Sequence, residues 1–316
     1  MGMLEGKVVI VTGAGRGIGR GVAELAAEEE AKVVVNDPGV AVDGSGTDKA
    51  PADEVVEAIR SRGGTALANY DSVASMQGGE SIIQAALDNF GRLDCLINVA
   101  GILRDRMIFN MSEQEWDDVI AVHLKGHFAC TKPAAVLMRQ QRYGRIINFS
   151  SQSGLWGNAG QANYGAAKSG IAGFTRVVAR DLGRYGVTCN CIAPRALTRM
   201  TADLPQRPAQ ARPAQERAVG AGIQELAPDY IAPMTCYLAT DQAWSINGQI
   251  FLVYGGTVAV LAHPLAQRTI FKEGMWTVDE LIEMAPQMME GIPNPAPPPA
   301  DLEVPGRPKT EAQAAS

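Results

Sequence analysis

Short runs of apolar and β-branched residues alternate along this chain with longer amphipathic stretches. Short apolar runs bounded by glycine and polar residues are typical of strands buried on both faces, and apolar positions at helical spacing are typical of packed helices. Strands are predicted at residues 7–12, 31–36, 65–70, 93–98, 145–149, 187–193 and, as the last strand, 249–253. Helices are predicted at residues 20–30, 52–62, 82–90, 113–140, 162–185 and 228–240. This alternation predicts an α/β fold with a doubly wound parallel sheet.

The pattern predicts a single domain over residues 5–258, because it shows no internal repeat and no second apolar core. Within this domain, residues 199–227 are rich in Pro, Gln, Ala and Arg and separate a strand from a helix, which is typical of a substrate lid. Residues 259–316 form a predicted C-terminal extension. It contains an amphipathic helix around residues 278–289 and an extended proline-rich segment at 293–308.

The composition is that of an ordinary globular protein, with 46% apolar and 20% charged residues among 316. A net charge of −6 gives no basic footprint for nucleic acid. No apolar run approaches the ~18 residues of a membrane helix, and the first residues do not resemble a signal peptide. We therefore expect a cytoplasmic protein that binds neither nucleic acid nor membranes.

The five cysteines are an odd number and show no Cys-x-x-Cys spacing. Buried free thiols are the expectation from this pattern, rather than disulfides or a zinc site. The sequence shows no other ligand cluster, so we expect no metal centre.

A glycine-rich turn, residues 13–19, follows the first predicted strand and precedes the first helix. Free backbone N–H groups and the helix dipole attract anions at such a place, and glycine lets a phosphate approach the backbone. The order of strand, turn and helix predicts a pyrophosphate site of the Rossmann type. Gly13, Arg16, Gly17, Ile18 and Gly19 are the predicted contacts.

Acidic residues end the second and third predicted strands. Asp37 lies eighteen residues beyond Gly19, where a carboxylate can accept hydrogen bonds from the adenosine ribose and repel a 2′-phosphate. This favours NAD over NADP, although Arg16 in the turn leaves NADP open. Asp71 could cap the adenine side of the nucleotide or merely cap a turn.

Tyr164 and Lys168 lie four residues apart in the predicted helix 162–185, so both side chains fall on one helix face. An ammonium group beside a phenol favours the ionised phenol, so we expect Lys168 to lower the pKa of Tyr164 and make it a general base. Ser151 follows the predicted strand 145–149 and could hydrogen-bond the oxygen of a carbonyl or an alcohol. The spacing alone also fits an ordinary pair of solvated helix side chains.

Taken together, these motifs resemble those of the classical short-chain dehydrogenases/reductases. The resemblance spans about residues 5–258 and follows the order of motifs in that family. The motifs that carry it are Thr12-Gly13-x-x-x-Gly17-Ile18-Gly19, Asn98-Val99-Ala100-Gly101, Ser151 and Tyr164-x-x-x-Lys168.

A closer resemblance is to the dehydrogenase part of peroxisomal multifunctional enzyme type 2, also called 17β-hydroxysteroid dehydrogenase type 4. Actinobacterial relatives that act on acyl-CoA and steroid substrates share it. The motifs that carry it include Val35-Asn36-Asp37, Gly101-Ile102-Leu103-Arg104-Asp105-Arg106, Val122-His123-Leu124-Lys125-Gly126 and Gly157-Asn158-Ala159-Gly160-Gln161-Ala162-Asn163-Tyr164.

The resemblance implies a role for each matching position. Tyr164 would be the general acid/base, Lys168 would bind the nicotinamide ribose, and Ser151 would orient the substrate oxygen. The full set of expected cofactor contacts is Gly13, Arg16, Gly17, Ile18, Gly19, Asp37, Asp71, Val73, Asn98, Ala100, Gly101, Tyr164, Lys168, Pro194 and Thr198.

The sequence departs from the family pattern at three positions. His123 stands where the general family has an asparagine, which puts the usual proton relay through a backbone-bound water in question. We expect His123 to pack or hydrogen-bond within the helix core rather than to replace a catalytic group. Val99 replaces the second asparagine of Asn-Asn-Ala-Gly, and Arg195 replaces the glycine after Pro194.

The function predicted from these features is an NAD-dependent oxidoreductase that interconverts a secondary alcohol and a ketone. The closer resemblance implies a (3R)-hydroxyacyl-CoA or a steroid-derived hydroxyl as substrate, in lipid or steroid degradation. A dehydrogenase of a free alcohol or ketone is one alternative, and a nucleotide-binding regulatory or structural subunit without turnover is another. A serine hydrolase fits poorly because Ser151 is not in a Gly-x-Ser-x-Gly elbow. We expect a homodimer or homotetramer, as family members commonly form.

Overall fold

The computed structural model describes residues 2–196, 227–299, 302 and 304–306. Two compact units divide these residues, the first with residues 2–196 and 227–262 and the second with those from His263 onward. Thr198 and, apart from Ala227, the predicted lid lie outside the described residues.

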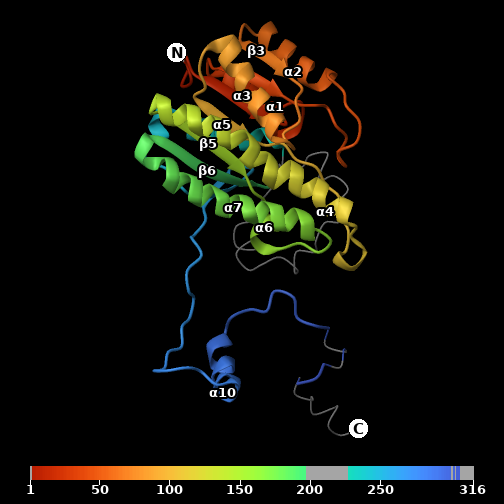
Figure 1. Cartoon of the computed structure of the whole chain (residues 1–316), viewed down its shortest axis with the longest axis vertical. Helices are drawn as coiled ribbons and strands as arrows, with labels where there is room; N and C mark the ends of the chain where they lie inside the picture. Colours follow the sequence, from red (N-terminus) through yellow and green to blue (C-terminus); the bar gives the residue numbers. More distant parts are fainter. Residues whose placement is uncertain (1, 197–226, 300–301, 303, 307–316) are drawn as a thin grey trace. The chain divides into compact units, whose positions relative to one another are not determined.

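The first unit is built on one eight-stranded sheet in the order β3-β2-β1-β4-β5-β6-β7-β8 (Figure 1). Its strands are β1 (Val8–Thr12), β2 (Lys32–Asn36), β3 (Thr65–Asn69), β4 (Cys95–Asn98), β5 (Gly144–Phe149), β6 (Val187–Pro194), β7 (Ile250–Tyr254) and β8 (Thr257–Val260). Strands β1 to β7 pair in parallel, which confirms the predicted fold. The prediction that residues 249–253 form the last strand is wrong, because the chain turns at Gly255-Gly256 and adds β8 antiparallel to β7.

Helices cover both faces of the sheet (Figure 1). They are α1 (Gly17–Glu28), α2 (Ala50–Ser61), α3 (Met76–Phe90), α4 (Glu113–Ile120), α5 (Gly126–Gln141), α6 (Gln152–Trp156), α7 (Ala162–Leu182) and α9 (Ala232–Ala239). Short 3₁₀ turns are η1 (Ile108–Asn110), η3 (Gly183–Tyr185), η5 (Pro228–Ile231) and η6 (Asp241–Ala243). Apolar side chains of α1, α2 and α9 pack on one face, and those of α3, α5 and α7 pack on the other.

The predicted helix 113–140 is divided in the structure. Helix α4 begins with a capping box made by Ser112 and Glu115, and it passes into the π-helical turn η2 (Ala121–Lys125) before α5 starts. A π-turn inserts an extra residue into a helix and occurs most often at functional sites. Here the inserted turn carries His123.

Burial of the strands explains why their sequences are almost wholly apolar. In β1, Val9 and Val11 point into one helix layer and Val8 and Ile10 into the other, and all four are buried. Because the strands are parallel, their carboxyl ends meet at one edge of the sheet. The strand order reverses between β1 and β4, where Thr12 pairs with Asn98. A ligand crevice is expected at this point.

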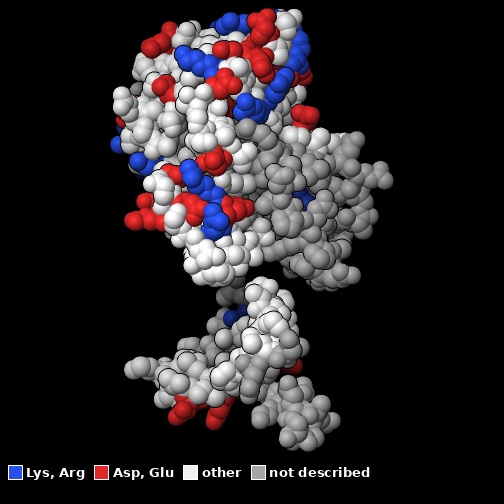
Figure 2. Space-filling view, turned by 90° about the vertical axis from the view of Figure 1, so that its right-hand side faces the viewer, with Lys and Arg blue, Asp and Glu red and all other residues white. Residues whose placement is uncertain are grey.

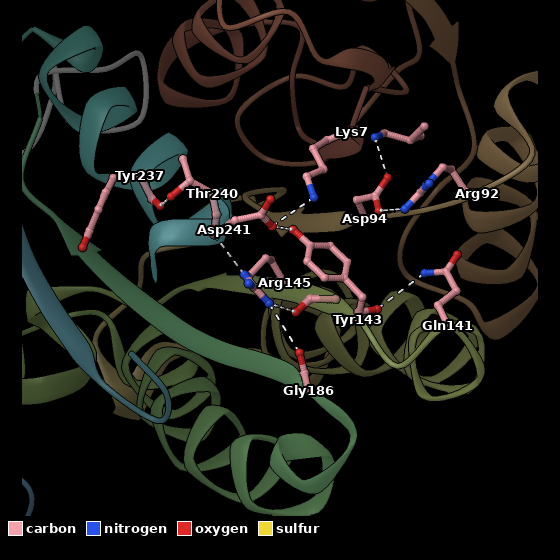
Figure 3. A network of polar contacts seen from close by, with 12 residues as sticks. Lys7, Arg92, Asp94, Gln141, Tyr143, Arg145, Gly186, Tyr237, Thr240 and Asp241 are labelled. Atoms are coloured by element: carbon pink, nitrogen blue, oxygen red, sulfur yellow. Dashed lines mark hydrogen bonds and ion pairs between the residues drawn. The ribbon is translucent and has the colours of Figure 1, made fainter. Parts of the chain in front are cut away.

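A polar network joins elements at the opposite edge, where the strands begin (Figure 3). Lys7 Nζ lies 4.1 Å from the centre of the Tyr143 ring, and the Arg145 guanidinium lies 4.6 Å from it. The Tyr143 hydroxyl donates to Asp241 (2.8 Å), which also pairs with Lys7 (3.0 Å). Arg145 is buried, and its Nε donates to the Thr240 carbonyl (3.1 Å). The network ties the starts of β1 and β5 to the segment after α9.

The charged surface and the state of the cysteines can be compared with the expectations from the sequence. On the face of the first unit in Figure 2, basic and acidic side chains lie interspersed over the described residues. All five cysteines are free and buried, which confirms the prediction of buried thiols. None of the helices within the described part of the chain is long and apolar enough to cross a membrane.

The second unit contains helix α10 (Val278–Met289), at the predicted place. Thr277 and Glu280 form a capping box at its first turn, and Lys272 pairs with Glu280 (2.6 Å). Arg268 donates to the Gln287 carbonyl (2.7 Å) near its other end. Polar contacts with residues close in sequence therefore bind both ends of α10.

Candidate active site

The glycine turn lies at the reversal of strand order. Gly13 has a φ of +67°, and a Cβ there would lie 2.7 Å from the Ala100 Cα. The turn therefore needs glycine both for its conformation and for the close approach of the loop after β4. Helix α1 begins at Gly17 with no side-chain cap and no acidic residue in its first turn. Its first N–H groups have no side-chain partner there, so they suit a pyrophosphate.

Asp37 lies beside the same turn, directly after β2. Its Oδ2 accepts a hydrogen bond from the Gly15 N–H (2.9 Å), and its Oδ1 accepts one from the Gly39 N–H (2.7 Å). The carboxylate is therefore held next to the glycine turn, where an adenosine ribose would lie. Arg16 is exposed at the start of α1. A group with a pyrophosphate and a ribose thus fits the residues present.

Other predicted nucleotide residues are already engaged in the scaffold. The Asp71 carboxylate accepts from Ser81 Oγ (2.7 Å) and from Asn69 Nδ2 (2.9 Å). The Asn98 side chain is buried and donates to Asn148 Oδ1 (3.0 Å). The Val73 side chain is buried in the apolar layer. The side chains of Asn98 and Val73 are thus already used within the fold.

The structure brings Ser151, Tyr164 and Lys168 together at the carboxyl edge of the sheet. Ser151 follows β5 and is the N-cap of α6, where its hydroxyl accepts from the Ser153 N–H (3.2 Å). Tyr164 lies in the first turn of α7, and a hydrogen bond links it to Ser151. Lys168 lies one turn later, with its Nζ 5.6 Å from the centre of the Tyr164 ring. The predicted juxtaposition of the three side chains is present.

The expected lowering of the Tyr164 pKa is not found in this structure. Burial raises the pKa of Tyr164 to about 12, the Ser151 hydrogen bond opposes this, and the negative charge of Asp105 adds to it. Tyr164 is half-buried, and the loss of water around its phenol disfavours the charged form more than the Ser151 hydrogen bond stabilises it. Tyr164 is therefore a neutral phenol near pH 7.

The side chain of Lys168 is buried, whereas a lysine in a solvated pair on a helix surface would be exposed. Its Nζ donates to the Phe149 carbonyl (2.7 Å), and burial lowers the pKa of Lys168 to about 8. Ser150 Oγ donates to the Lys168 carbonyl (2.8 Å) and joins the end of β5 to α7. Lys168 is thus a buried cation held by a strand end, which excludes the solvated alternative.

His123 is buried and hydrogen-bonds the backbone of the loop after β4 rather than a group of its own helix. It is fully buried, and its Nε2 lies 2.8 Å from the Ile102 carbonyl oxygen and 3.1 Å from the Ile102 nitrogen. Its ring meets the Tyr164 ring edge to face, with centres 5.1 Å apart. Burial and the charge of Lys168 hold the pKa of His123 well below its usual value. The ring is therefore neutral, and it contacts the candidate acid/base directly.

The segment after Ile102 is fastened to the first turn of α7, a feature that sequence reasoning missed. Asn163 Nδ2 donates to the carbonyls of Arg104 (3.0 Å) and Glu115 (2.9 Å), and its Oδ1 accepts from the Tyr164 N–H (2.7 Å). Gln161 Nε2 donates to the Asp105 carboxylate (2.7 Å). The motif Gln161-Ala162-Asn163-Tyr164 could have indicated this feature, because side-chain amides directly before Tyr164 can hold the start of its helix in place.

The carboxamide side of the crevice is described only in part. Pro194 ends β6, and the Arg195 guanidinium lies 6.0 Å from the centre of the Tyr254 ring. Arg195 is thus placed beside an aromatic ring at the end of β7. Among the residues that the structure describes, no three His, Cys, Asp or Glu side chains are grouped as metal ligands.

Comparison with known proteins agrees with this geometry. A family described as short chain dehydrogenase matches residues 7–209. The chain belongs to the short-chain dehydrogenase family. It is therefore an oxidoreductase that acts on CH–OH groups, and such enzymes use a nicotinamide cofactor.

Several relatives share much of the chain. Hydroxyacyl-CoA dehydrogenase ChsB1 of Mycobacterium tuberculosis is 42% identical over 88% of this chain and 87% of its own. Peroxisomal multifunctional enzyme type 2 of Mus musculus is 43% identical over 81% of this chain, which spans only 33% of that larger protein. A crystal structure of a short chain dehydrogenase from Mycobacterium avium superposes with a TM-score of 0.79 and 43% identity, over 95% of this chain and 98% of that one.

The pKa of Lys168 gives a test of its contact with the nicotinamide nucleotide. If the ammonium binds the nucleotide, the wild-type affinity falls as the pH rises through about 8, because the charge is lost there. A Lys168→Met variant should bind more weakly and lose this pH dependence. Fluorescence titration with the reduced nucleotide on both sides of that pH measures both effects. Lys132→Met, at an exposed lysine of α5, is the control, and an unchanged profile in Lys168→Met would contradict the contact.

Proposed function

We propose that this chain is an NAD-dependent dehydrogenase that interconverts a secondary alcohol and a ketone, with a (3R)-hydroxyacyl-CoA or a steroid-derived hydroxyl as substrate. The observation that carries the proposal is the grouping of Ser151, Tyr164 and Lys168 at the sheet edge that also holds the glycine turn. In this proposal Tyr164 gives and takes a proton, the Ser151 hydroxyl binds the substrate oxygen, and Lys168 is a cation at the edge of the sheet where the glycine turn would bind the nucleotide.

Each side chain has a separate task in this proposal. NAD, when bound, supplies the hydride acceptor. Tyr164 moves a proton to or from the substrate oxygen, and Ser151, which already hydrogen-bonds Tyr164, donates to that oxygen. Lys168 binds the nicotinamide ribose and presents a positive charge near the phenol. In the structure itself, Ser151 is the group that lowers the pKa of the Tyr164 phenol against the effect of burial.

The nucleotide preference rests on Asp37. A carboxylate can accept from both ribose hydroxyls and repels a 2′-phosphate. The hydrogen bonds from the Gly15 and Gly39 N–H groups hold this carboxylate beside the glycine turn. Arg16 is the side chain that would favour NADP, but it is exposed and lies one residue before the helix start. NAD is therefore the proposed cofactor.

The substrate class rests on the sequence resemblance and on the name of one relative. A relative that matches 88% of the chain is named a hydroxyacyl-CoA dehydrogenase. A free alcohol or ketone remains the alternative within the same chemistry. The cytoplasmic location also stays a prediction, and so does the lid over the site.

Replacing Tyr164 by Phe tests the catalytic assignment. The wild type is first assayed with NAD against hydroxyacyl-CoAs, hydroxysteroids and simple alcohols, by the absorbance of reduced nicotinamide. With the best of these, Tyr164→Phe should lower kcat by about 10²- to 10⁴-fold, since it lacks the group that moves the proton. Tyr185→Phe, near the far end of α7, should keep full activity. A wild type that binds NAD but turns over no alcohol would favour the regulatory alternative instead.

Replacing Asp37 by Asn tests the cofactor. The variant loses the charge that repels a 2′-phosphate, so the ratio of kcat/KM with NAD to that with NADP should fall about tenfold or more, equivalent to about 1.4 kcal/mol. Asp88→Asn, at an exposed acid of α3, should leave the ratio unchanged. A wild-type enzyme that prefers NADP would overturn the assignment.

We also propose a homodimer or homotetramer. Exposed apolar side chains lie on α5 and α7, namely Phe128 (45% exposed), Val136 (49%) and Val177 (57%). Covering such side chains with a second copy removes apolar surface from water. Size-exclusion chromatography with light scattering should give two or four chains per particle, and a monomer would contradict the proposal.

A further inference from the structure

One buried imidazole has no task in the mechanism proposed above. His127 is the second residue of α5 and is almost completely buried. Its Nδ1 donates to the His123 carbonyl (2.6 Å), and its Nε2 accepts from the Phe149 N–H (3.4 Å). The ring therefore bridges the π-turn η2 and the carboxyl end of β5.

The charge state of this ring is set by what faces it. Burial and, after it, the Lys168 ammonium lower the pKa of His127 to about 3. His123 on the preceding turn is neutral as well. The carbonyls of His123 and Asn98 both face the His127 ring and favour its charged form, but burial and the Lys168 charge outweigh them. A neutral imidazole has one donor and one acceptor. In His127 the donor, Nδ1, binds the His123 carbonyl, and the acceptor, Nε2, binds the Phe149 N–H group.

One arm of the bridge leads to Lys168. The Phe149 nitrogen donates to His127, and the Phe149 carbonyl accepts from Lys168 Nζ (2.7 Å). The same residue of β5 is thus held by the imidazole on its nitrogen side and by the ammonium on its carbonyl side. A shift of Phe149 would move the carbonyl that fixes the cation.

The other arm leads to Tyr164. The carbonyl that His127 binds belongs to His123, whose ring meets the Tyr164 ring at 88° with centres 5.1 Å apart. Gly101 leaves room for the His123 ring, because a Cβ at Gly101 would lie 2.3 Å from its Cε1. The position of the π-turn therefore decides where the surface that supports Tyr164 lies.

We propose that His127 is a positioning residue for the reaction, which holds Lys168 through Phe149 and Tyr164 through His123. This rests on the roles proposed for Tyr164 and Lys168. An apolar side chain of similar volume would fill the space, but it would leave the buried Phe149 N–H without this partner and the His123 carbonyl with the Gly126 N–H alone. Such groups relax toward other partners, and a displacement of about 1 Å at reacting groups costs on the order of 10²-fold in rate.

Three variants separate the two arms. His127→Leu removes both hydrogen bonds. The Asn side chain places its amide near the position of Nδ1, so His127→Asn can keep the bond to His123. The longer Gln side chain reaches toward the position of Nε2, so His127→Gln can keep the bond to Phe149. Cys130→Ala, at a buried thiol on the same helix, is the control for loss of packing.

The leucine variant should lower kcat by about ten- to a hundredfold, while KM for the substrate changes less than about threefold. The limb of the pH profile of kcat/KM that belongs to Lys168 should shift to lower pH, because the cation loses a well-placed carbonyl that favours its charged form. His127→Gln should keep the wild-type nucleotide affinity and lose kcat. His127→Asn should keep the wild-type kcat and lose nucleotide affinity. Cys130→Ala should match the wild type in kcat, KM, the pH profile and nucleotide affinity.

Tyr164→Phe is measured alongside in the same assays. If that variant keeps its turnover, the proposed function itself fails. If it is inactive while His127→Leu is folded and has the wild-type kcat and pH profile, only the positioning role is overturned. If His127→Leu does not fold by circular dichroism, the other two variants decide. The proposal is overturned if His127→Asn and His127→Gln both show wild-type kinetics. It is also overturned if none of the three variants folds, because the ring would then serve the fold alone.

Discussion

A buried ammonium group sets the electrostatics of this site. Lys168 is held by the Phe149 carbonyl in a place where water does not reach it, and burial brings its pKa to about 8. In such surroundings a charge acts on its neighbours more strongly than in water. The ammonium helps to keep His123 and His127 neutral. Both imidazoles can therefore serve as fixed hydrogen-bond partners of the backbone.

The sheet makes this arrangement possible because parallel strands end at one edge. The glycine turn follows β1, Asn98 ends β4, and Ser151 follows β5, although these residues lie far apart in the sequence. The opposite edge is pinned by the Tyr143 network. The Tyr143 network thus lies at the end of the sheet opposite the candidate site, which is carried by the loops after the strands.

The departures from the usual family pattern acquire a physical meaning in the structure. His123 stands in a π-turn, binds the backbone of Ile102 and supports the Tyr164 ring. Its carbonyl accepts from His127. Arg195 lies beside Tyr254, where its planar cation has an aromatic neighbour. None of these contacts needs a change in the sheet or in the order of the motifs.

What the sequence determined by itself is local. Alternating apolar and amphipathic runs, the glycine turn before a helix and the spacing of four between Tyr164 and Lys168 each follow from the period of a strand or a helix. They gave the parallel sheet, seven of its eight strands and the helix face that Tyr164 and Lys168 share. The eighth strand was missed because β8 is short and lies at the sheet edge, where only alternate side chains are covered.

Tertiary structure alone decided the rest. The pKa of Tyr164 was expected to fall because of one neighbour in the helix, but burial of the phenol and the charge of Asp105 raise it. The bridge made by His127 depends on a contact with Phe149 of β5, which no local pattern encodes. Helical spacing says which side chains share a face, whereas desolvation and the partners of a buried polar group depend on the segments that fold against it.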